Sequence, residues 1–162
     1  MLLRLVQTSD DHALALVRIV LGFVFFAHGA QKVLGWFGGN GFDATMGFFT
    51  HTMGIPAPLA VLAILAEFLG GIGLVVGLLS RVAALGIGVD MVVAVLLVHA
   101  PNGFFMNWYG NQKGEGFEYH LLVIAMAFLV VVRGAGAWSV DRALNAWLAR
   151  STRFRMEPAA LR

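Results

Sequence analysis

Residues 56–100 read PAPLAVLAILAEFLGGIGLVVGLLSRVAALGIGVDMVVAVLLVHA. Two apolar runs, at about 57–79 and 82–100, are separated only by Ser80 and Arg81. A helix needs roughly 20 mainly apolar residues to cross the hydrocarbon core of a bilayer, and each run is long enough. The short break forces the two runs into a tight antiparallel hairpin. This stretch therefore predicts two adjacent transmembrane helices.

The rest of the chain extends this pattern to four helices. Further apolar runs lie at about 12–31 and 117–133. Hydrophobic residues make up 59% of the chain, charged residues 12%, and the mean hydropathy is +0.82. Soluble domains are about a quarter charged, so a water-soluble fold is excluded. We predict an all-α protein in which residues 1–162 form one membrane domain, a four-helix transmembrane bundle.

The basic residues predict the orientation of this bundle. Cytoplasmic flanks of membrane helices collect Lys and Arg, and all nine arginines fall on one side of the predicted topology. This set comprises Arg4, Arg18, Arg81, Arg133, Arg142, Arg150, Arg153, Arg155 and Arg162. Lys32 and Lys113 fall on the other side. We therefore expect a multi-pass protein of the inner (plasma) membrane with both termini inside, whose basic residues meet anionic lipid and not nucleic acid.

Two segments outside the apolar runs have their own predicted structure. The outer loop after the first run is long, about 25 residues, and Asp43 is placed to begin a short interfacial helix within it. Residues 139–151 have the spacing of an amphipathic helix that lies on the inner leaflet. The alternative for this last segment is a plain cytoplasmic tail.

Three ionisable residues interrupt the predicted spans: Arg18, Glu67 and Asp90. A charge at the bilayer centre costs at least about 2.5–3.5 kcal/mol, so such residues face the bundle interior and have partners. Counted along their helices, all three lie near mid-depth. We predict a buried polar network among them. It serves either as a polar staple that fixes helix register or in proton or substrate handling.

A second group of polar residues is expected at the outer helix ends. His28 and Lys32 end the first helix, His99 ends the third, and Glu118 and His120 begin the fourth. Histidine titrates near neutral pH, which suits proton transfer to a quinone or phenol. His28, His99, Glu118 and His120 are therefore the candidate catalytic residues of an outer mouth. The spacing of the histidines does not specify a metal site, and a purely structural role at the interface is the alternative.

Aromatic residues gather in the two outer loops, among them Trp36, Trp108 and Tyr109. Trp and Tyr belts are common at membrane interfaces and need no ligand to explain them. The alternative is an apolar vestibule for a flat lipophilic molecule. Under that interpretation these three aromatics, together with Gln31 and Lys32, are candidate ligand-binding residues.

The motifs resemble those of the DoxX family. RIVLGFVFFAHGAQKVLGWFGGNGF at residues 18–42 is similar to its first-helix signature, and the similarity continues through the hairpin, NGFF, GFEYHLL and GAGAWSVD to about residue 144. The resemblance implies a four-helix membrane protein, with some members linked to thiosulfate:quinone oxidoreductase and others to quinone or catechol resistance and defence against oxidants. It implies the motif positions Arg18, His28, Gln31, Lys32, Glu67, His99, Glu118 and His120. No pattern here points to a thiosulfate site, so the chain is not placed in that branch.

The expected function follows from titratable groups beside a lipophilic vestibule, which is what coupled proton and electron transfer to a quinone requires. The chain has no cysteine, which excludes disulfides, thiolate metal sites and iron–sulfur clusters. We expect a redox-associated protein that binds a quinone-like or phenolic molecule and receives electrons from a soluble or membrane oxidoreductase subunit. One alternative is a membrane scaffold or assembly subunit that recruits a soluble oxidoreductase. Another is a small proton-coupled transporter.

Overall fold

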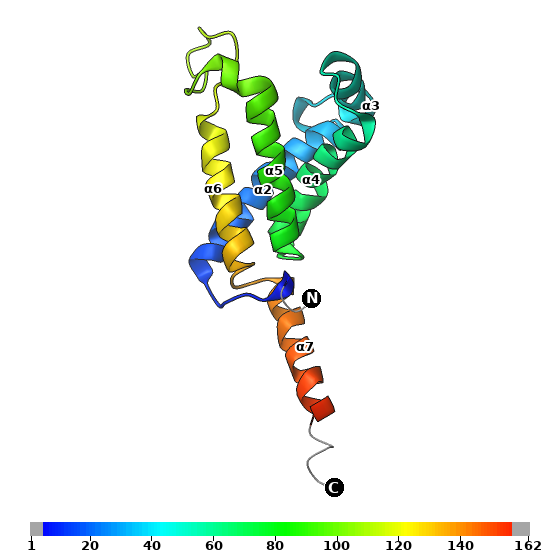
Figure 1. The fold of residues 1–162 in the computed structure, drawn as a ribbon, viewed down its shortest axis with the longest axis vertical. Helices are drawn as coiled ribbons and strands as arrows, with labels where there is room; N and C mark the ends of the chain where they lie inside the picture. The colour runs from blue at the N-terminus through cyan, green and yellow to red at the C-terminus, as the bar shows by residue number, and fades with distance from the viewer. Residues whose placement is uncertain (1–4, 157–162) are drawn as a thin grey trace.

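The computed structural model describes residues 5–156 and the side chains of residues 5–150, and this part of the chain is helical, without strands (Figure 1). The helices are α2 (His12–Leu34), α3 (Gly41–Gly47), α4 (Ala57–Val76), α5 (Ser80–Ala94), α6 (Glu118–Arg133) and α7 (Val140–Met156). Shorter turns are η1 (Trp36–Gly38), η2 (Phe48–Thr52), η3 (Val95–His99) and η4 (Ala100–Asn102). The all-α class predicted from the sequence is confirmed.

Within residues 5–156, three helical segments are long and apolar enough to cross a membrane: His12–Leu34, Ala57–Val76 and Ser80–Asn102. They cover three of the four predicted spans. The fourth prediction, about 117–133, falls on α6, which has 16 residues and is therefore shorter than the roughly 20 that a perpendicular span needs.

Both ends of α2 are capped. The Asp11 carboxylate accepts a hydrogen bond from the Leu14 amide at 3.0 Å, and Gly35 takes a left-handed conformation after the last turn.

The two ends of the bundle differ. We call the end where α2 begins, α4 ends, α5 begins and α6 ends the termini end, and the opposite end, which carries α3 and the loop 103–117, the loop end. Figure 1 shows α2 and α4 diverging from α5 and α6 toward the loop end. The buried apolar core joins α2, α4, α5 and α6 and includes Leu21, Phe25, Leu74, Ile87 and Val123.

Glycines set the closest helix contact, which is between α2 and α4. A side chain added at Gly22 would collide with Leu74 and the backbone of Val75, and one added at Gly29 would overlap the backbone of Phe68. A side chain at Gly71 would collide with α2 in the same way. Helices in lipid gain little from hiding apolar side chains, so close backbone approach of this kind holds them together.

The outward faces of the long helices carry large apolar side chains. Phe23 on α2, Leu85 on α5 and Leu122 on α6 are all exposed. Exposed apolar side chains distributed around an apolar bundle are typical of contact with lipid chains. The bilayer is therefore a partner of this protein, as the sequence predicted.

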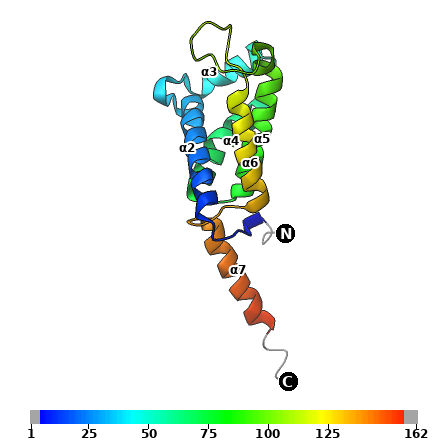
Figure 2. The same ribbon diagram turned by 90° about the vertical axis from the view of Figure 1, so that its left-hand side faces the viewer.

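Helix α7 begins beside the termini end and extends away from the bundle along its long axis (Figures 1 and 2). The amphipathic helix predicted at 139–151 is present, but its expected course flat along a leaflet is not what the structure shows. The reason lies at its start, where Asp141 is fixed to the α4–α5 turn and Arg142 pairs with Asp10 at 2.6 Å. Among the predicted inner arginines, the side chains of Arg4, Arg153, Arg155 and Arg162 lie outside the described residues.

Candidate functional site

Arg18 is completely buried, but its partners differ from those predicted. Its guanidinium donates to the carbonyl oxygens of Ala135 at 2.7 Å, Val75 at 2.9 Å, Trp138 at 3.0 Å and Ala137 at 3.4 Å, and also to that of Leu74. These carbonyls belong to the end of α4 and to the connection between α6 and α7. Arg18 therefore joins three chain segments at the termini end.

The predicted network of Arg18 with Glu67 and Asp90 is accordingly corrected. Helix α4 runs antiparallel to α2, and the carbonyl of Leu74 that Arg18 reaches lies two helical turns, about 10 Å, beyond Glu67. A long side chain also extends toward the nearest unpaired helix carbonyls, which attract a cation. Counting residues along the helices placed the three charged residues at a similar depth in the membrane. The side chain of Arg18 instead points toward the termini end, away from Glu67.

Asp141 is a structural residue of this junction that the sequence did not reveal. Its two carboxylate oxygens accept the amide hydrogens of Leu79 at 2.8 Å and Ser80 at 2.9 Å, and its own amide donates to the carbonyl of Gly77 at 2.8 Å. Asp141 is 1% exposed. It satisfies the first amides of α5, and the only sequence signal was its place in the GAGAWSVD motif.

Toward the loop end, a second cluster brings together Lys32, Glu67 and Asp90 from α2, α4 and α5. The Lys32 ammonium forms an ion pair with the Glu67 carboxylate, and the carboxyl group of Asp90 lies beside that of Glu67. Glu67 is 7% exposed and Asp90 is half-buried. Two of the three residues predicted as a buried network are thus together, with Lys32 in the place expected for Arg18.

Helices α2 and α6 each add one more titratable residue near this carboxyl pair. Glu67 lies close enough to act electrostatically on both His28 and Tyr119. His28 is exposed one turn before Lys32, and the Tyr119 hydroxyl is buried without a hydrogen-bond partner among the described residues. Helices α2, α4, α5 and α6 therefore each contribute a residue to the cluster around Glu67.

The remaining residues of the predicted mouth divide into two places. The rings of His99 and His120 lie 4.0 Å apart between centroids, and His99 Nδ1 donates to the carbonyl of Glu115 at 2.8 Å. The wide turn η3 ends at His99, and π-helical turns of this kind are frequent at functional sites. His120 is 5% exposed, and its Nδ1 has no partner among the described residues.

Glu118 instead anchors the loop 103–117. Its Oε1 accepts the Trp108 indole hydrogen at 3.0 Å and the Met106 amide hydrogen at 3.1 Å. His28 lies with the Lys32 cluster and not with the other two histidines. The four predicted catalytic residues therefore do not form one constellation, and no three His, Asp or Glu side chains within residues 5–150 are grouped as ligands for a metal ion.

Most of the predicted aromatic ligand-binding residues face away from the bundle. Trp108 and Tyr109 are 78% and 91% exposed, and Trp36 is also exposed. Such positions fit an interfacial belt better than a vestibule. Gln31 has a structural contact, because its side-chain amide donates to the carbonyl of Phe37 at 3.2 Å and holds the turn after α2.

A hollow of about 330 Å³ nevertheless lies at the loop end, between α2 and the segment that contains α3 and η2. It is lined by Gln31, Lys32, Asn40, Thr45, Phe48 and Phe49 together with three small residues. Binding sites for small molecules start at about this volume. Of the predicted ligand-binding residues, Gln31 and Lys32 line it, and Phe48 and Phe49 belong to the aromatic group of the first outer loop.

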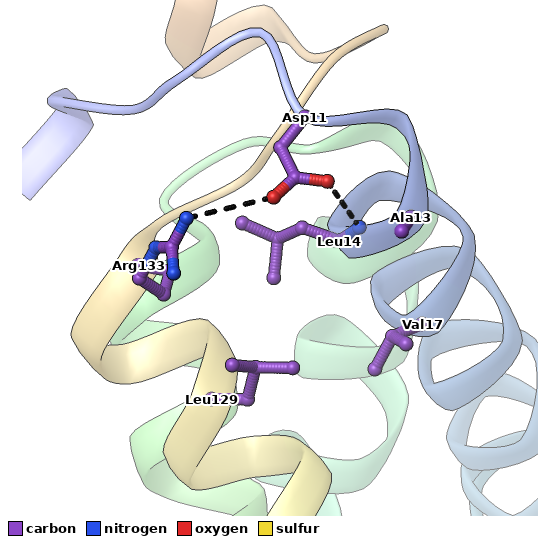
Figure 3. A pocket seen from close by; sticks show the side chains of 6 residues that line it. All are labelled: Asp11, Ala13, Leu14, Val17, Leu129 and Arg133. Carbon is purple, nitrogen blue, oxygen red and sulfur yellow. Dashed lines mark hydrogen bonds and ion pairs between the residues drawn. The ribbon is translucent and has the colours of Figure 1, made fainter.

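A smaller hollow, of about 140 Å³, lies at the termini end between α2 and α6 (Figure 3). Its two charged residues are Asp11 and Arg133, whose side chains are 3.6 Å apart. Figure 3 shows the Asp11 carboxylate placed between Arg133 and the amide of Leu14. Asp11 thus caps α2 and pairs with Arg133, so the two charged side chains of this hollow have a structural role.

Comparison with known proteins gives related membrane proteins. A model of the DoxX family matches residues 13–100. The inner membrane protein YqjF of Escherichia coli K12 is 27% identical over 136 residues, 84% of this chain and 95% of that protein. The uncharacterized membrane protein Rv3486 of Mycobacterium tuberculosis is 30% identical over 152 residues, 88% and 87% of the two chains. The Putative oxidoreductase CatD of Bacillus subtilis is 27% identical over 111 residues, 68% and 72% of the two chains. No solved structure matches the chain significantly.

Proposed function

Because this chain belongs to the DoxX family, we propose that it is a multi-pass inner-membrane protein that binds a quinone-like or phenolic molecule and helps a partner protein to reduce or detoxify it. One relative carries the name of an oxidoreductase and another that of an inner membrane protein. The chain contains no cysteine with which to carry electrons itself. The partner, a soluble or membrane oxidoreductase subunit, supplies them.

The proposed topology has four spans with both termini inside, and α6 crosses as a short fourth helix. Arg81 and Arg133 support it, because both lie at the termini end, where Arg81 binds the carbonyl of Gln7 at 3.1 Å and Arg133 pairs with Asp11. Cytoplasmic flanks collect such charges. The Lys32 cluster and the larger hollow then lie in the outer half of the bundle.

The observation that carries the proposal is the position of Lys32 between the buried carboxyl pair and the loop-end hollow. Ionisable groups inside a membrane bundle mark functional sites, because hydrocarbon penalises charge strongly. Phe48 and Phe49 contribute aromatic rings to the lining of the hollow, and Gln31 and Asn40 contribute amide groups. Sites for small molecules combine apolar contacts with polar groups that fix the orientation of the ligand.

The test is the binding of a water-soluble quinone, menadione, to the purified protein in detergent, measured as a thermal shift. We expect the quinone to stabilise the wild type and to have little effect on Lys32→Met. Asp43→Asn, which removes an exposed carboxylate from α3, is the matched control and should respond like the wild type. No shift in the wild type, or equal shifts in all three proteins, would overturn the proposal.

A charge-swapped variant separates a ligand site from a polar staple. Lys32→Glu combined with Glu67→Lys keeps an ion pair between α2 and α4 but exchanges the charge that faces the hollow. If the pair is only a staple, the swap restores both stability and quinone response. We expect it to restore folding relative to the single variants and to leave the quinone response lost.

A scaffold role is the second candidate, and the course of α7 favours it. This helix leaves the bundle at the termini end and extends along the long axis, where a soluble oxidoreductase can reach it (Figure 2). Truncation after Ala143 would keep the contacts of Asp141 and Arg142 while removing most of α7. Loss of a co-purifying oxidoreductase with unchanged menadione binding would support the scaffold role, and retention of that partner would exclude α7 as its attachment.

A further inference from the structure

Lys32 belongs to two environments at once. Its ammonium is paired with Glu67 inside the bundle, and it is the one ionisable residue among those that line the loop-end hollow. Its side chain is 24% exposed, whereas that of Glu67 is 9% exposed. Lys32 therefore connects the hollow with the Glu67 carboxylate, which does not itself line the hollow.

The cluster contains one ammonium, on Lys32, and two carboxyl groups, on Glu67 and Asp90. It is electrically neutral only when one of the two carboxyl groups carries a proton. Lys32 then balances the one remaining negative charge. A second anion brought to Lys32 would leave a net negative charge in an apolar bundle, which is costly unless the cluster takes up a proton at the same time.

The hollow favours a single aromatic ring. An engineered apolar cavity of about 150 Å³ holds benzene, so a hollow of about 330 Å³ has room for one substituted ring. The rings of Phe48 and Phe49 are 6.1 Å apart and inclined at 48°. This arrangement gives a bound ring both a face and an edge to contact.

Resting on the proposed function, we propose that Lys32 and Glu67 ionise an acidic ring hydroxyl, so that the ligand is held in the loop-end hollow as a phenolate. The O–H bond of the phenol breaks and its proton passes to Lys32 Nζ, while Nζ passes a proton to the Glu67 carboxylate that it already contacts. The products are a phenolate, a lysine ammonium and a glutamic acid. No electron is transferred in this step.

The test uses 4-nitrophenol, whose phenolate is yellow and whose neutral form is not. At a pH below the nitrophenol's own pKa, we expect the wild-type protein to produce saturable phenolate absorbance. A pH indicator should detect no net proton release, because Glu67 retains the proton. Nitrophenol that binds by equilibrium dialysis but stays colourless, or that releases one proton per molecule bound, would overturn the inference. These wild-type measurements do not depend on any variant folding.

Two variants and a control sharpen the result. Glu67→Gln leaves the ammonium without its carboxylate, so we expect bound phenolate with release of one proton per ligand to solvent. Lys32→Met should abolish the phenolate colour, whereas Lys113→Met, a change in the loop 103–117 outside the hollow, should retain it. Colour and proton count that are the same in Glu67→Gln and the wild type would refute the role of Glu67. Failure of both menadione and nitrophenol to bind would instead refute the proposed function itself.

Discussion

Replacing Arg18 with methionine tests the junction at the termini end, because it keeps the apolar stem and removes the guanidinium. The carbonyls of Ala135 and Ala137 would lose their donor in places that water cannot reach, since the two residues are 1% and 0% exposed. A buried carbonyl left unpaired costs about 1–3 kcal/mol, so these two give about 2–6 kcal/mol. The other three carbonyls add little to this free-energy cost, because neighbouring amides or solvent can reach them.

The assay is unfolding in detergent micelles by titration with a denaturing detergent, followed by circular dichroism. Arg142→Met is the matched control, since it removes a half-exposed guanidinium from a single ion pair with Asp10. An exposed pair of this kind contributes less than about 1 kcal/mol. A difference in unfolding free energy between Arg18→Met and Arg142→Met of under about 1 kcal/mol would refute the reasoning.

A double-mutant cycle tests the separation of the two clusters. Arg18 and Glu67 share no contact in the structure, so Arg18→Met and Glu67→Gln should have additive effects on stability within about 0.5 kcal/mol. A coupling energy above about 0.5 kcal/mol would support the Arg18–Glu67 network predicted from the sequence. Arg18→Lys should fall between wild type and Arg18→Met, because a compact ammonium cannot span the carbonyls that the planar fork reaches.

Two further changes test the packing and the turn. Gly29→Ala forces a methyl group onto the backbone of Phe68 and should destabilise the protein by about 1–3 kcal/mol, whereas Gly88→Ala meets only the Ala127 methyl at 3.5 Å and should be neutral or stabilising. Equal unfolding midpoints for the two would contradict the close α2–α4 contact. Asp141→Ala leaves the buried Ser80 amide unpaired and should cost about 1–3 kcal/mol, whereas solvent can reach the part-buried amide of Leu79. Wild-type stability in that variant would show that solvent replaces the carboxylate.

The candidate site was only partly predictable from the sequence. Glu67 and Asp90 were expected to point inward because hydrocarbon penalises an unpaired charge, and the structure places them together. Their cation was assigned incorrectly. Arg18 and Lys32 both lie on α2, and counting residues gave Arg18 the better depth, but a long side chain reaches along the helix axis in a direction that depth counts do not give.

The histidines illustrate the same limit. The predicted topology placed His28, His99 and His120 at the outer ends of their helices. Of these three, only His99 and His120 are in contact in the structure. His99 ends the π-helical turn η3, and this turn has no distinct sequence pattern. Glu118 was correctly placed at the start of α6, but its partner Trp108 comes from a loop whose path the sequence does not specify.

The sequence by itself determined that this protein is helical and belongs in a membrane, because long apolar runs leave the backbone no partners in lipid except its own amides and carbonyls. It also determined which charged residues must find partners inside the bundle. Only the tertiary structure decided the pairing. Whether Lys32 or Arg18 contacts Glu67 depends on the axial offset between α2 and α4. That offset is set by the glycines at which the two backbones touch.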